Sequence, residues 1–404
     1  MADYWLLNCL YSRIQKWLQE TSRFRGYLAQ FRNGRLCCAT PDKGHRRLGA
    51  VRRHRPLLAP MFAVAVAIGL SAVHHVSLVT WNLLAPCYAT ATKYPWASPD
   101  ELAWPARRKR ILSKLAEMDA DVVCLQEVEI ATWMELEQQL RDLGYDGVLQ
   151  QTSRGHPVAN AVCVRRSALE VVRVESRSRA LITVLRAREA PQRAPGMASP
   201  LYLANVHLEA SAEKGATRLA QLRKLLRRIE LQCATDVANG NGRSRDLSSE
   251  ADAHDAAVVI AGDFNFDRTS ELHSFLSTGS FPAVEQGRTK GTTEYALLPL
   301  NDAYLETPPP WGPTVRSTYR NGRLLDFVWT SSAVEILRTM PASKLAGSTR
   351  PHQLPSATHP SDHLPIGAVF SWPGEPAHDV SGLRPAWQQL SIESVVKRRG
   401  TPKQ

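Results

Sequence analysis

The sequence lacks the residue patterns of several common protein classes. Its 404 residues include 7 Cys, an odd number, with no Cys-x-x-Cys pair, so neither a disulfide framework nor a thiolate zinc site is indicated. G-x-S-x-G, H-E-x-x-H and G-x-x-x-x-G-K-[ST] are also absent, and these patterns mark serine hydrolases, zinc proteases and P-loop proteins. With 44% hydrophobic and 22% charged residues, the composition is that of a globular chain and excludes collagen-like or wholly disordered proteins.

Cysteine usage fits a reducing compartment best. Cys124 and Cys163 lie within apolar runs, where we expect buried and unreactive thiols.

Positive charge is concentrated at the start of the chain. The net charge is +12, and residues 1–56 hold ten Arg and two Lys against three acidic residues, a net +9. The remaining 348 residues therefore carry only +3. A basic arm on a nearly neutral body is typical of a targeting segment, of contact with an anionic polymer or membrane, or simply of a solvated surface.

An uncharged stretch of 17 residues, Leu57–Val73, follows this arm. Its length is at the lower limit for crossing a bilayer, about 17–25 residues, and its position is too internal for an ordinary secretory signal. Three interpretations stay open: a membrane anchor, an organelle-targeting leader formed with the Arg-rich arm, and an apolar helix packed on the next domain. We expect an intracellular protein that is cytoplasmic, organellar or membrane-anchored.

From residue 77 onward, short apolar runs alternate with amphipathic stretches, which predicts one α/β domain over residues 77–372. The expected strands are Ser77–Leu84, Asp121–Leu125, Ala159–Val164, Leu169–Val174, Leu181–Leu185, Leu201–His207, Ala257–Ala261, Leu325–Trp329 and Ile366–Phe370. The expected helices are Arg107–Met118, Thr132–Leu143, Ala212–Gln232 and Ser270–Leu276. Residues 1–76 would form an N-terminal extension and 373–404 a polar tail, with loops at 190–200 and 234–255.

Polar side chains stand at or beside the ends of six predicted strands. They are Asn82, Glu127, His207, Asp263 with Asn265, Asp326, and Asp362 with His363. Strand ends in α/β proteins converge on one rim, where ligands bind. Carboxylate and amide oxygens suit Mg²⁺ or Mn²⁺ better than zinc, and such a cation neutralises phosphate charge and positions a water. An Asp beside a His suits phosphodiester hydrolysis, because a carboxylate can fix the imidazole tautomer while the imidazole donates to a phosphoryl oxygen.

Each of these residues taken singly has a structural explanation. Asp and Asn after strands are common turn residues, Glu127 alone could be a solvated carboxylate at a helix start, and His207 alone could be a core histidine. Their joint occurrence in this order favours the functional interpretation.

The sequence resembles the endonuclease/exonuclease/phosphatase superfamily over roughly residues 77–372. The motifs that carry the resemblance are WN (81–82), LQE (125–127), GDFN (262–265), LDF (325–327) and SDH (361–363). It is most similar to the deadenylase-type branch of nocturnin, the Angel proteins and the carbon-catabolite-repressor nucleases, through WNLLAPCY, NVHLEAS and HPSDHLPIGAVFSW. The resemblance implies a four-layer α/β sandwich of two mixed sheets flanked by helices.

The resemblance also implies a role for each site residue. Glu127 would be the main Mg²⁺ ligand (Mn²⁺ is an alternative), with Asn82 beside it and Asp362 at the metal centre. The implied catalytic residues are His207, which contacts phosphate, Asp263, which orients or deprotonates the attacking water, and Asp326, which orients the charge-stabilising His363. Asn265 would hold the phosphate or a second metal. The predicted substrate-binding residues are therefore Asn265, together with Phe266 and Tyr319 as aromatic rings that could stack on bases.

Two departures from the branch bear on the substrate. Phe266 follows GDFN where small polar residues are usual, and Val158–Ala159–Asn160 replaces an aspartate-glycine pair. Both weaken the prediction of poly(A) specificity. Phe266, Trp311, Tyr319 and Phe327 are candidates for stacking on RNA bases, although Phe327 is better explained as a core residue.

These observations predict a Mg²⁺-dependent phosphodiesterase, a deadenylase-like 3′-to-5′ exoribonuclease that converts single-stranded, poly(A)-like RNA tails to nucleoside 5′-monophosphates. Alternatives on the same fold are a sphingomyelinase-like lipid phosphodiesterase, a DNA repair nuclease and a dinucleotide phosphatase. An inactive RNA- or partner-binding module is the alternative from another class, and the complete set of site residues argues against it. The sequence leaves the oligomeric state and the number of metal ions open.

Overall fold

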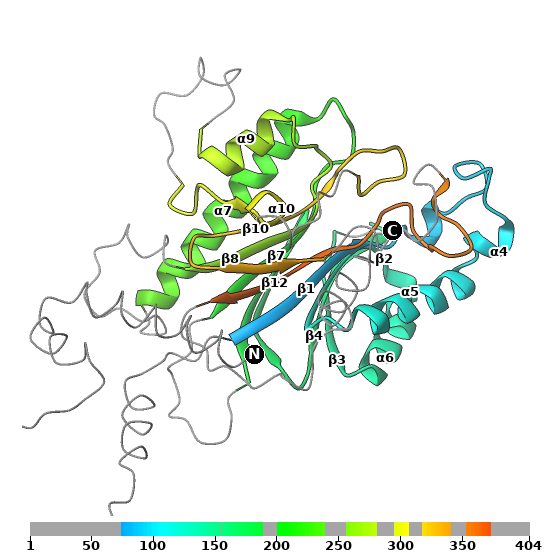
Figure 1. The fold of residues 1–404 in the computed structure, drawn as a ribbon, viewed down its shortest axis with the longest axis horizontal. Helices are drawn as coiled ribbons and strands as arrows, with labels where there is room; N and C mark the ends of the chain where they lie inside the picture. Colours follow the sequence, from blue (N-terminus) through cyan, green and yellow to red (C-terminus); the bar gives the residue numbers. More distant parts are fainter. Residues whose placement is uncertain are drawn as a thin grey trace, which may run out of the picture. The chain divides into compact units, whose positions relative to one another are not determined.

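The computed structural model describes residues 74–153, 155–188, 200–238, 256–280, 295–306, 317–340 and 353–372 (Figure 1). All of them belong to one compact unit, Ala65–Gln404. The basic arm, Leu57–Val73, Trp311 and the tail 373–404 lie outside the described residues. Within the described ranges, no helix is both long enough and apolar enough to cross a membrane.

Two six-stranded mixed sheets make up the centre of the domain. The first sheet, in the order β11-β12-β1-β2-β4-β3, consists of β1 (His74–Asn82), β2 (Val122–Glu129), β3 (Tyr145–Leu149), β4 (Val158–Arg165), β11 (Glu335–Thr339) and β12 (Ile366–Trp372). The second sheet, in the order β5-β6-β7-β8-β10-β9, consists of β5 (Leu169–Arg177), β6 (Ala180–Ala187), β7 (Leu201–His207), β8 (Ala257–Asp263), β9 (Asn301–Asp302) and β10 (Asp326–Thr330).

Each sheet contains one parallel pair at its centre, and this register brings polar strand ends together. β1 and β2 are parallel, with Asn82 opposite Gln126. β7 and β8 are parallel, with His207 opposite Asp263, and antiparallel β10 places Asp326 beside the same Asp263. Both parallel pairs are joined through a helix, as a parallel crossover requires.

Helices cover the outer faces of both sheets, which gives the four layers predicted for the fold (Figure 1). The helices are α4 (Pro99–Leu102), α5 (Trp104–Met118), α6 (Trp133–Asp142), α7 (Gly215–Ala238), α9 (Glu271–Thr278) and α10 (Ala303–Glu306), with 3-10 turns η2 (Pro86–Tyr88) and η3 (Ile130–Thr132). Ile111 of α5 and Leu136 of α6 pack in one buried cluster with Val123 of the first sheet. Leu222 and Ile229 of α7 belong to the cluster of the second sheet.

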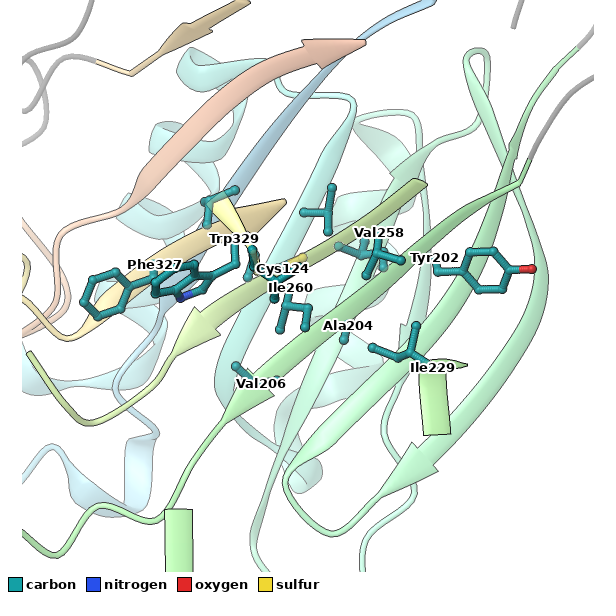
Figure 2. Close-up of a cluster of buried hydrophobic side chains, with 14 of the residues drawn as sticks. Cys124, Tyr202, Ala204, Val206, Ile229, Val258, Ile260, Phe327 and Trp329 are labelled. Carbon is teal, nitrogen blue, oxygen red and sulfur yellow. The ribbon is translucent and has the colours of Figure 1, made fainter. Parts of the chain in front are cut away.

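The largest hydrophobic cluster joins residues of both sheets (Figure 2). Cys124 of β2 is buried there with Val258 and Ile260 of β8 and Trp329 of β10. Cys163 is also buried, and burial raises the pKa of both thiols. Both cysteines are therefore protonated core residues at neutral pH, as the apolar runs around them predict.

A buried polar bridge ties the sheets together beneath the strand ends. The amide nitrogen of Asn205 donates to the carbonyls of Leu125 (2.9 Å) and Ala161 (2.8 Å), and its amide oxygen accepts from Gln126 (2.7 Å). The Asn205 carbonyl accepts from Asn160 at 3.2 Å. Asn205 has no exposed surface, so these bonds fix the position of β7 against β2 and β4.

The predicted loop at 234–255 begins too early, because α7 continues to Ala238. Asp236 holds the extra turn against the second sheet. Its carboxylate accepts hydrogen bonds from the Tyr202 hydroxyl (2.7 Å) and from the Arg173 guanidinium (2.7 and 2.9 Å). β1 also begins at His74, three residues before the predicted start of the domain.

Candidate active site

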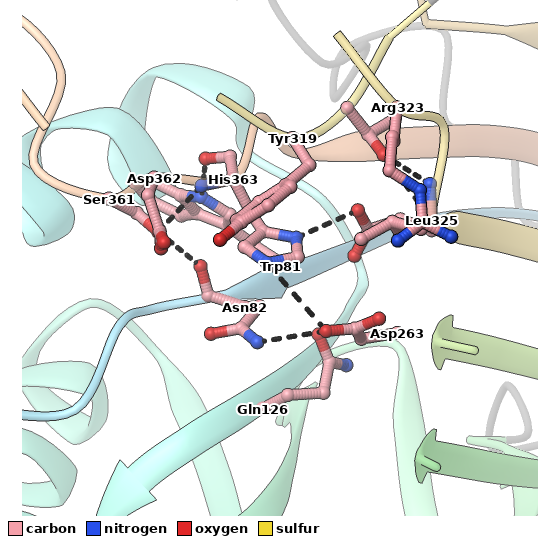
Figure 3. Close-up of polar contacts among 12 residues, drawn as sticks. Trp81, Asn82, Gln126, Asp263, Tyr319, Arg323, Leu325, Ser361, Asp362 and His363 are labelled. Atoms are coloured by element: carbon pink, nitrogen blue, oxygen red, sulfur yellow. Dashed lines mark hydrogen bonds and ion pairs between the residues drawn. The ribbon is translucent and has the colours of Figure 1, made fainter. Parts of the chain in front are cut away.

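The side chains of Asn82, Asp263 and His363, predicted at or beside strand ends, lie close together (Figure 3). Glu127, His207 and Asp326 lie next to them. At the centre of this group are His363, Asp326 and Asp263, which offer ligand atoms that lie within 4.8 Å of one another. His363 Nδ1 is 2.9 Å from Asp326 Oδ2, and His363 Nε2 is 3.7 Å from Asp263 Oδ2. All three side chains are buried, so their charges interact strongly.

The charges of this group determine its protonation. Burial of the ring lowers the pKa of His363, but the carboxylates of Asp326 and Asp263 outweigh burial and raise that pKa to about 10. Burial raises the pKa of Asp263, and the positive charge on His363 opposes that rise. His363 is therefore an imidazolium at neutral pH, with Nδ1 held by Asp326 and Nε2 directed toward the site.

Three groups fix the backbone of His363. Its carbonyl accepts from Trp81 Nε1 (2.8 Å) and lies 2.9 Å from His359 Nε2, and its N–H donates to Ser361 Oγ (3.1 Å). Burial lowers the pKa of His359 to about 4, so this ring is neutral and donates from Nε2. Ser361 in turn donates to the Asn82 carbonyl at 2.6 Å, which links the loop before β12 to the end of β1.

Asn82 aligns the carboxylate of Asp263. Its amide nitrogen donates to Asp263 Oδ2 at 3.1 Å, and its amide oxygen accepts from the Leu84 N–H at 3.0 Å. The other oxygen of Asp263 accepts from the Asn265 N–H at 3.0 Å. Asn82 was expected beside the metal, and its contacts show that it positions Asp263.

A backbone irregularity turns Glu127 toward the site. The register of β2 against β4 shifts between Leu125 and Val128, and Glu127 between them has φ +53°. Bulges of this kind redirect side chains next to active sites. Glu127 Oε2 accepts from the Ala85 N–H at 3.1 Å, and Oε1 lies 4.0 Å from His207 Nε2.

His207 lies between the two carboxylates that face the site. Its Nε2 is 4.0 Å from Glu127 Oε1 and 3.7 Å from Asp263 Oδ2. Both distances are too long for direct hydrogen bonds, so this nitrogen is available to a ligand. Its backbone N–H donates to the Arg179 carbonyl at 3.0 Å.

The donor set fits a hard divalent cation such as Mg²⁺, which prefers carboxylate and amide oxygens. Glu127, half-buried at the rim, is the residue that would hold the cation. Asp263 lies nearby, because the carboxylates of Asp263 and Glu127 both face His207 Nε2. One oxygen of Asp326 is buried without a hydrogen-bond partner among the described residues. The side chains of Asp326 and His363 are nevertheless hydrogen-bonded to each other, so we interpret that pair as an acid–base group rather than as metal ligands.

The metal role implied for Asp362 stays a prediction, and its contacts within the protein are with Tyr94 and Arg320. Its carboxylate accepts a hydrogen bond from the Tyr94 hydroxyl (2.7 Å) and lies 4.0 Å from Arg320 Nε. Asp362 therefore positions Tyr94 and Arg320 at the side of the site.

Sequence reasoning named Tyr319 but missed Tyr94, Trp96 and Arg320, with which Tyr319 forms an aromatic and cationic group beside Asp362. The Arg320 guanidinium lies 5.1 Å from the ring of Tyr94, 5.2 Å from that of Trp96 and 5.8 Å from that of Tyr319. Trp96 is 40% exposed. Tyr94, Trp96 and Arg320 lie in loops without a recognisable motif, so no pattern in the sequence could identify them.

Arg107 is a second missed residue, and it holds the loops behind the site. Its fully buried guanidinium donates to the carbonyls of Leu83 (2.6 Å), Leu84 and Pro360 (2.8 Å). Burial lowers its pKa to about 10, so Arg107 remains charged at neutral pH.

The prediction that Phe266 stacks on a base is wrong. Its side chain is 2% exposed, stacked on Phe327 with ring centroids 5.6 Å apart and packed edge-on against Phe264 at 5.5 Å. Both faces are covered by protein. Phe327 is a core residue, as expected, whereas the half-buried ring of Tyr319 lies 4.7 Å from that of His363 and remains a substrate-binding candidate.

Asn265 closes the turn after β8. Its φ is +54°, and its amide nitrogen donates to the Leu208 carbonyl at 3.0 Å. This bond joins the end of β8 to the end of β7, next to His207. The predicted contact of Asn265 with phosphate stays a prediction.

Three curated relatives show the breadth of the similarity. The chain is 25% identical over 339 residues to Carbon catabolite repressor protein 4 homolog 4 of Arabidopsis thaliana, covering 72% of this chain and 76% of that protein. It is 24% identical to 2′,5′-phosphodiesterase 12 of Mus musculus (73% of this chain, 51% of that protein) and 24% identical to the CCR4-Not complex 3′-5′-exoribonuclease subunit Ccr4 of Schizosaccharomyces pombe (73% and 49%). The chain thus spans about half the length of the last two relatives.

A solved structure agrees with the architecture. The crystal structure of ANGEL2, a 2′,3′-cyclic phosphatase, aligns with a TM-score of 0.57 at 20% identity, covering 74% of this chain and 95% of that one. At this identity the likeness shows the fold, an α/β sandwich of two mixed sheets flanked by helices. The family model described as Endonuclease/Exonuclease/phosphatase family matches residues 79–363, which include every strand end of the site. The chain belongs to the endonuclease/exonuclease/phosphatase family.

Proposed function

We propose that the protein is a Mg²⁺-dependent phosphodiesterase that removes nucleotides from the 3′ end of single-stranded RNA as nucleoside 5′-monophosphates. The observation that carries the proposal is the environment of Asp263. Its Oδ2 atom faces the Asn82 amide at 3.1 Å and the imidazole nitrogens of His363 and His207, each at 3.7 Å. A base, a fixed imidazolium and a second imidazole around one point are what in-line attack on a phosphate requires.

The residues divide the chemistry between them. Asp263, aligned by Asn82, accepts a proton from the attacking water, and its raised pKa favours that transfer. His363 donates from Nε2 to a phosphoryl oxygen and stabilises the negative charge that develops on it. The water oxygen bonds to phosphorus while the bond to the 3′ oxygen breaks, which leaves a shortened RNA with a 3′-hydroxyl. Mg²⁺ held by Glu127 would neutralise phosphate charge and orient the water.

Support for RNA comes from two directions. The fission yeast relative is named a 3′-5′-exoribonuclease subunit, and the motifs of the chain resemble the deadenylase-type branch. The exposed ring of Trp96 and the half-buried ring of Tyr319 flank Arg320 beside the site, and aromatic rings next to a cation are typical of single-strand binding. Preference for adenosine rests on the resemblance alone.

The test is a cleavage assay with the full chain. The protein would be incubated with Mg²⁺ and a 5′-labelled RNA ending in adenosines, beside an RNA ending in another base, a 2′,5′-linked oligoadenylate, a DNA oligomer and sphingomyelin. We expect a ladder that shortens from the RNA 3′ end, disappears with a chelator and is absent in Glu127→Gln. Hydrolysis of DNA or sphingomyelin without cleavage of RNA would overturn the RNA assignment while retaining the phosphodiesterase.

For residues 1–76 we propose a role in intracellular placement. A fluorescent reporter fused to these residues and followed by carbonate extraction distinguishes the alternatives. Retention in the membrane pellet supports the anchor, a soluble organellar signal supports the leader, and diffuse cytoplasmic signal contradicts both.

A further inference from the structure

A basic cavity lies beside the active site, between the β5–β6 turn and helix α7. Its volume is about 510 Å³, within the range of about 300–1,000 Å³ that ligand sites occupy. Five of its lining residues are cationic: Arg177, Arg179, Lys224, Arg227 and Arg228. None of these residues takes part in the chemistry assigned above.

The β5–β6 turn lines both this cavity and a second one that reaches the site. Arg177, Ser178 and Arg179 also line a second cavity of about 320 Å³, whose wall includes His207. The Arg179 carbonyl accepts from the His207 N–H at 3.0 Å. On the other side of the turn, the basic cavity is lined by Leu208, whose N–H donates to the Asp263 carbonyl at 3.0 Å. A polymer that crossed this turn from the site would therefore reach the basic cavity.

The acidic residues beside the cavity balance only part of its charge. Glu175 pairs with Arg177 and Arg228, and Glu209 pairs with Arg179 at 2.8 Å. These five cations and two carboxylates give the cavity a net charge of +3, concentrated on α7. Such half-exposed pairs contribute about 0–1 kcal/mol each, so a phosphate can replace a carboxylate at little cost.

Two of the cations have no acidic partner in the part of the chain that the structure describes. They are Lys224, which is exposed, and Arg227, whose guanidinium rests 5.6 Å from the ring of Tyr295. Unpaired like charges along one wall of a cavity create a potential that attracts a polyanion.

We propose that this cavity binds backbone phosphates of the RNA upstream of the scissile bond, so that the enzyme holds several nucleotides rather than the terminal one alone. The inference rests on the proposed function, because the RNA bound in the cavity is the upstream part of the proposed substrate. A strand fits the cavity because the cations line a recess, which a nucleic-acid chain can enter.

The experiment compares Lys224→Glu with Lys109→Glu in the full chain. Both are exposed helical lysines, but Lys109 belongs to α5, which packs on the other sheet. The substrates are a ten-nucleotide RNA and a dinucleotide with the same 3′ end. For Lys224→Glu we expect at least a fivefold rise in KM on the ten-nucleotide RNA and less than a twofold change in kcat/KM on the dinucleotide. The slope of log KM against log salt concentration should also fall by about 0.7 for each phosphate that the variant no longer neutralises. Lys109→Glu should change none of these values.

The outcomes separate this inference from the proposed function. Equal KM values for the two variants on the ten-nucleotide RNA, with normal melting temperatures, would overturn the inference and leave the exoribonuclease intact. If the wild type cleaves neither RNA, the proposed function fails, and fluorescence anisotropy with the ten-nucleotide RNA still tests the cavity. Loss of binding to phosphatidylserine vesicles in Lys224→Glu, with RNA affinity unchanged, would overturn the inference in favour of a membrane contact.

Discussion

The substitution Asp326→Asn tests whether the Asp326 carboxylate keeps His363 protonated during turnover. Burial of the ring lowers the pKa of His363, but the charges of Asp326 and Asp263 raise it to about 10. Asparagine keeps the shape of the side chain that lies 2.9 Å from Nδ1 and removes its charge. We expect the pKa of His363 to fall toward its ordinary value of about 6.5.

The expected loss of activity depends on pH. With a pKa of about 10, nearly every His363 is protonated at about pH 7.5, whereas with a pKa of about 6.5 only about a tenth would be. The kcat at about pH 7.5 therefore falls by up to about tenfold from protonation alone, and the loss shrinks toward about pH 5.5. Asp263 stays 3.7 Å from Nε2 and retains part of the shift, so tenfold is the upper end of this effect.

The assay is single-turnover release of a labelled nucleotide between about pH 5.5 and 9.5. The alkaline limb of the Asp326→Asn profile should lie at least about one unit below that of the wild type. Asp302→Asn is the matched control, because Asp302 is another buried carboxylate in contact with an imidazole, His273 at 3.2 Å, outside the site. Coincident alkaline limbs for Asp326→Asn and wild type, with both proteins folded, would refute this reasoning.

Three further predictions concern the metal ligand, the bridge between the sheets and the turn after β8. Glu127→Gln should lower Mg²⁺-dependent turnover on the order of 10²-fold or more and abolish the rise in melting temperature that Mg²⁺ gives the wild type; an unchanged Mg²⁺ response contradicts the assignment. Asn205→Leu should lower the free energy of unfolding in urea by about 3 kcal/mol. The reason is that two carbonyls and the Gln126 amide each lose the hydrogen bond to Asn205, and a buried polar group that loses its partner costs about 1–3 kcal/mol. A loss under about 1 kcal/mol would show that the bridge adds little. Gly262→Ala should lower both the melting temperature and kcat, because Gly262 has φ +144° and an added Cβ would clash with the Val206 carbonyl oxygen; a variant with wild-type values for both disproves that packing constraint.

The sequence predicts the strands that carry the site because those strands are buried on both faces. β8, for example, is entirely buried and appears as an uninterrupted apolar run that ends at Asp263. A polar residue at the end of such a run is conspicuous, and this is why Asp263 and Glu127 can be found without coordinates. The strand end of β7 yields His207 for the same reason.

The strands that the sequence does not predict are all at the edges of sheets. β3 and β11 are the outer strands of the first sheet, and β9 is an outer strand of the second. Edge strands are partly exposed, as the mixed burial of β3 shows, so their apolar pattern is weak. The Asp and Gly within β3 weaken its strand propensity further.

Contacts between distant segments decide the surroundings of the site residues, which sequence reasoning does not give. Phe266 follows a catalytic motif, yet its ring is covered by Phe327 from another strand. Asp362 stands next to His363, yet its partner Tyr94 lies 268 positions away. Local spacing identifies residues near the chemistry, but the partner of each side chain depends on the tertiary arrangement.

Backbone strain at the site is also invisible in the sequence. Among the described residues, four non-glycine positions have positive φ. One of them, Asp119, ends helix α5, and the other three, Leu84, Glu127 and Asn265, surround the candidate site. Such conformations cost on the order of 1–3 kcal/mol each and persist only where other contacts impose them.

The contacts that impose this strain come from the active-site side chains themselves. Asn82 accepts a hydrogen bond from the N–H of Leu84, and Asp263 accepts one from the N–H of Asn265. Glu127 accepts one from the N–H that follows Leu84 in the chain. Each of the three side chains therefore holds a strained turn in place in addition to the role proposed for it in the chemistry. Removing any of them lets the turn relax, so the geometry of the remaining site residues changes together with the chemistry that the removed group supplied.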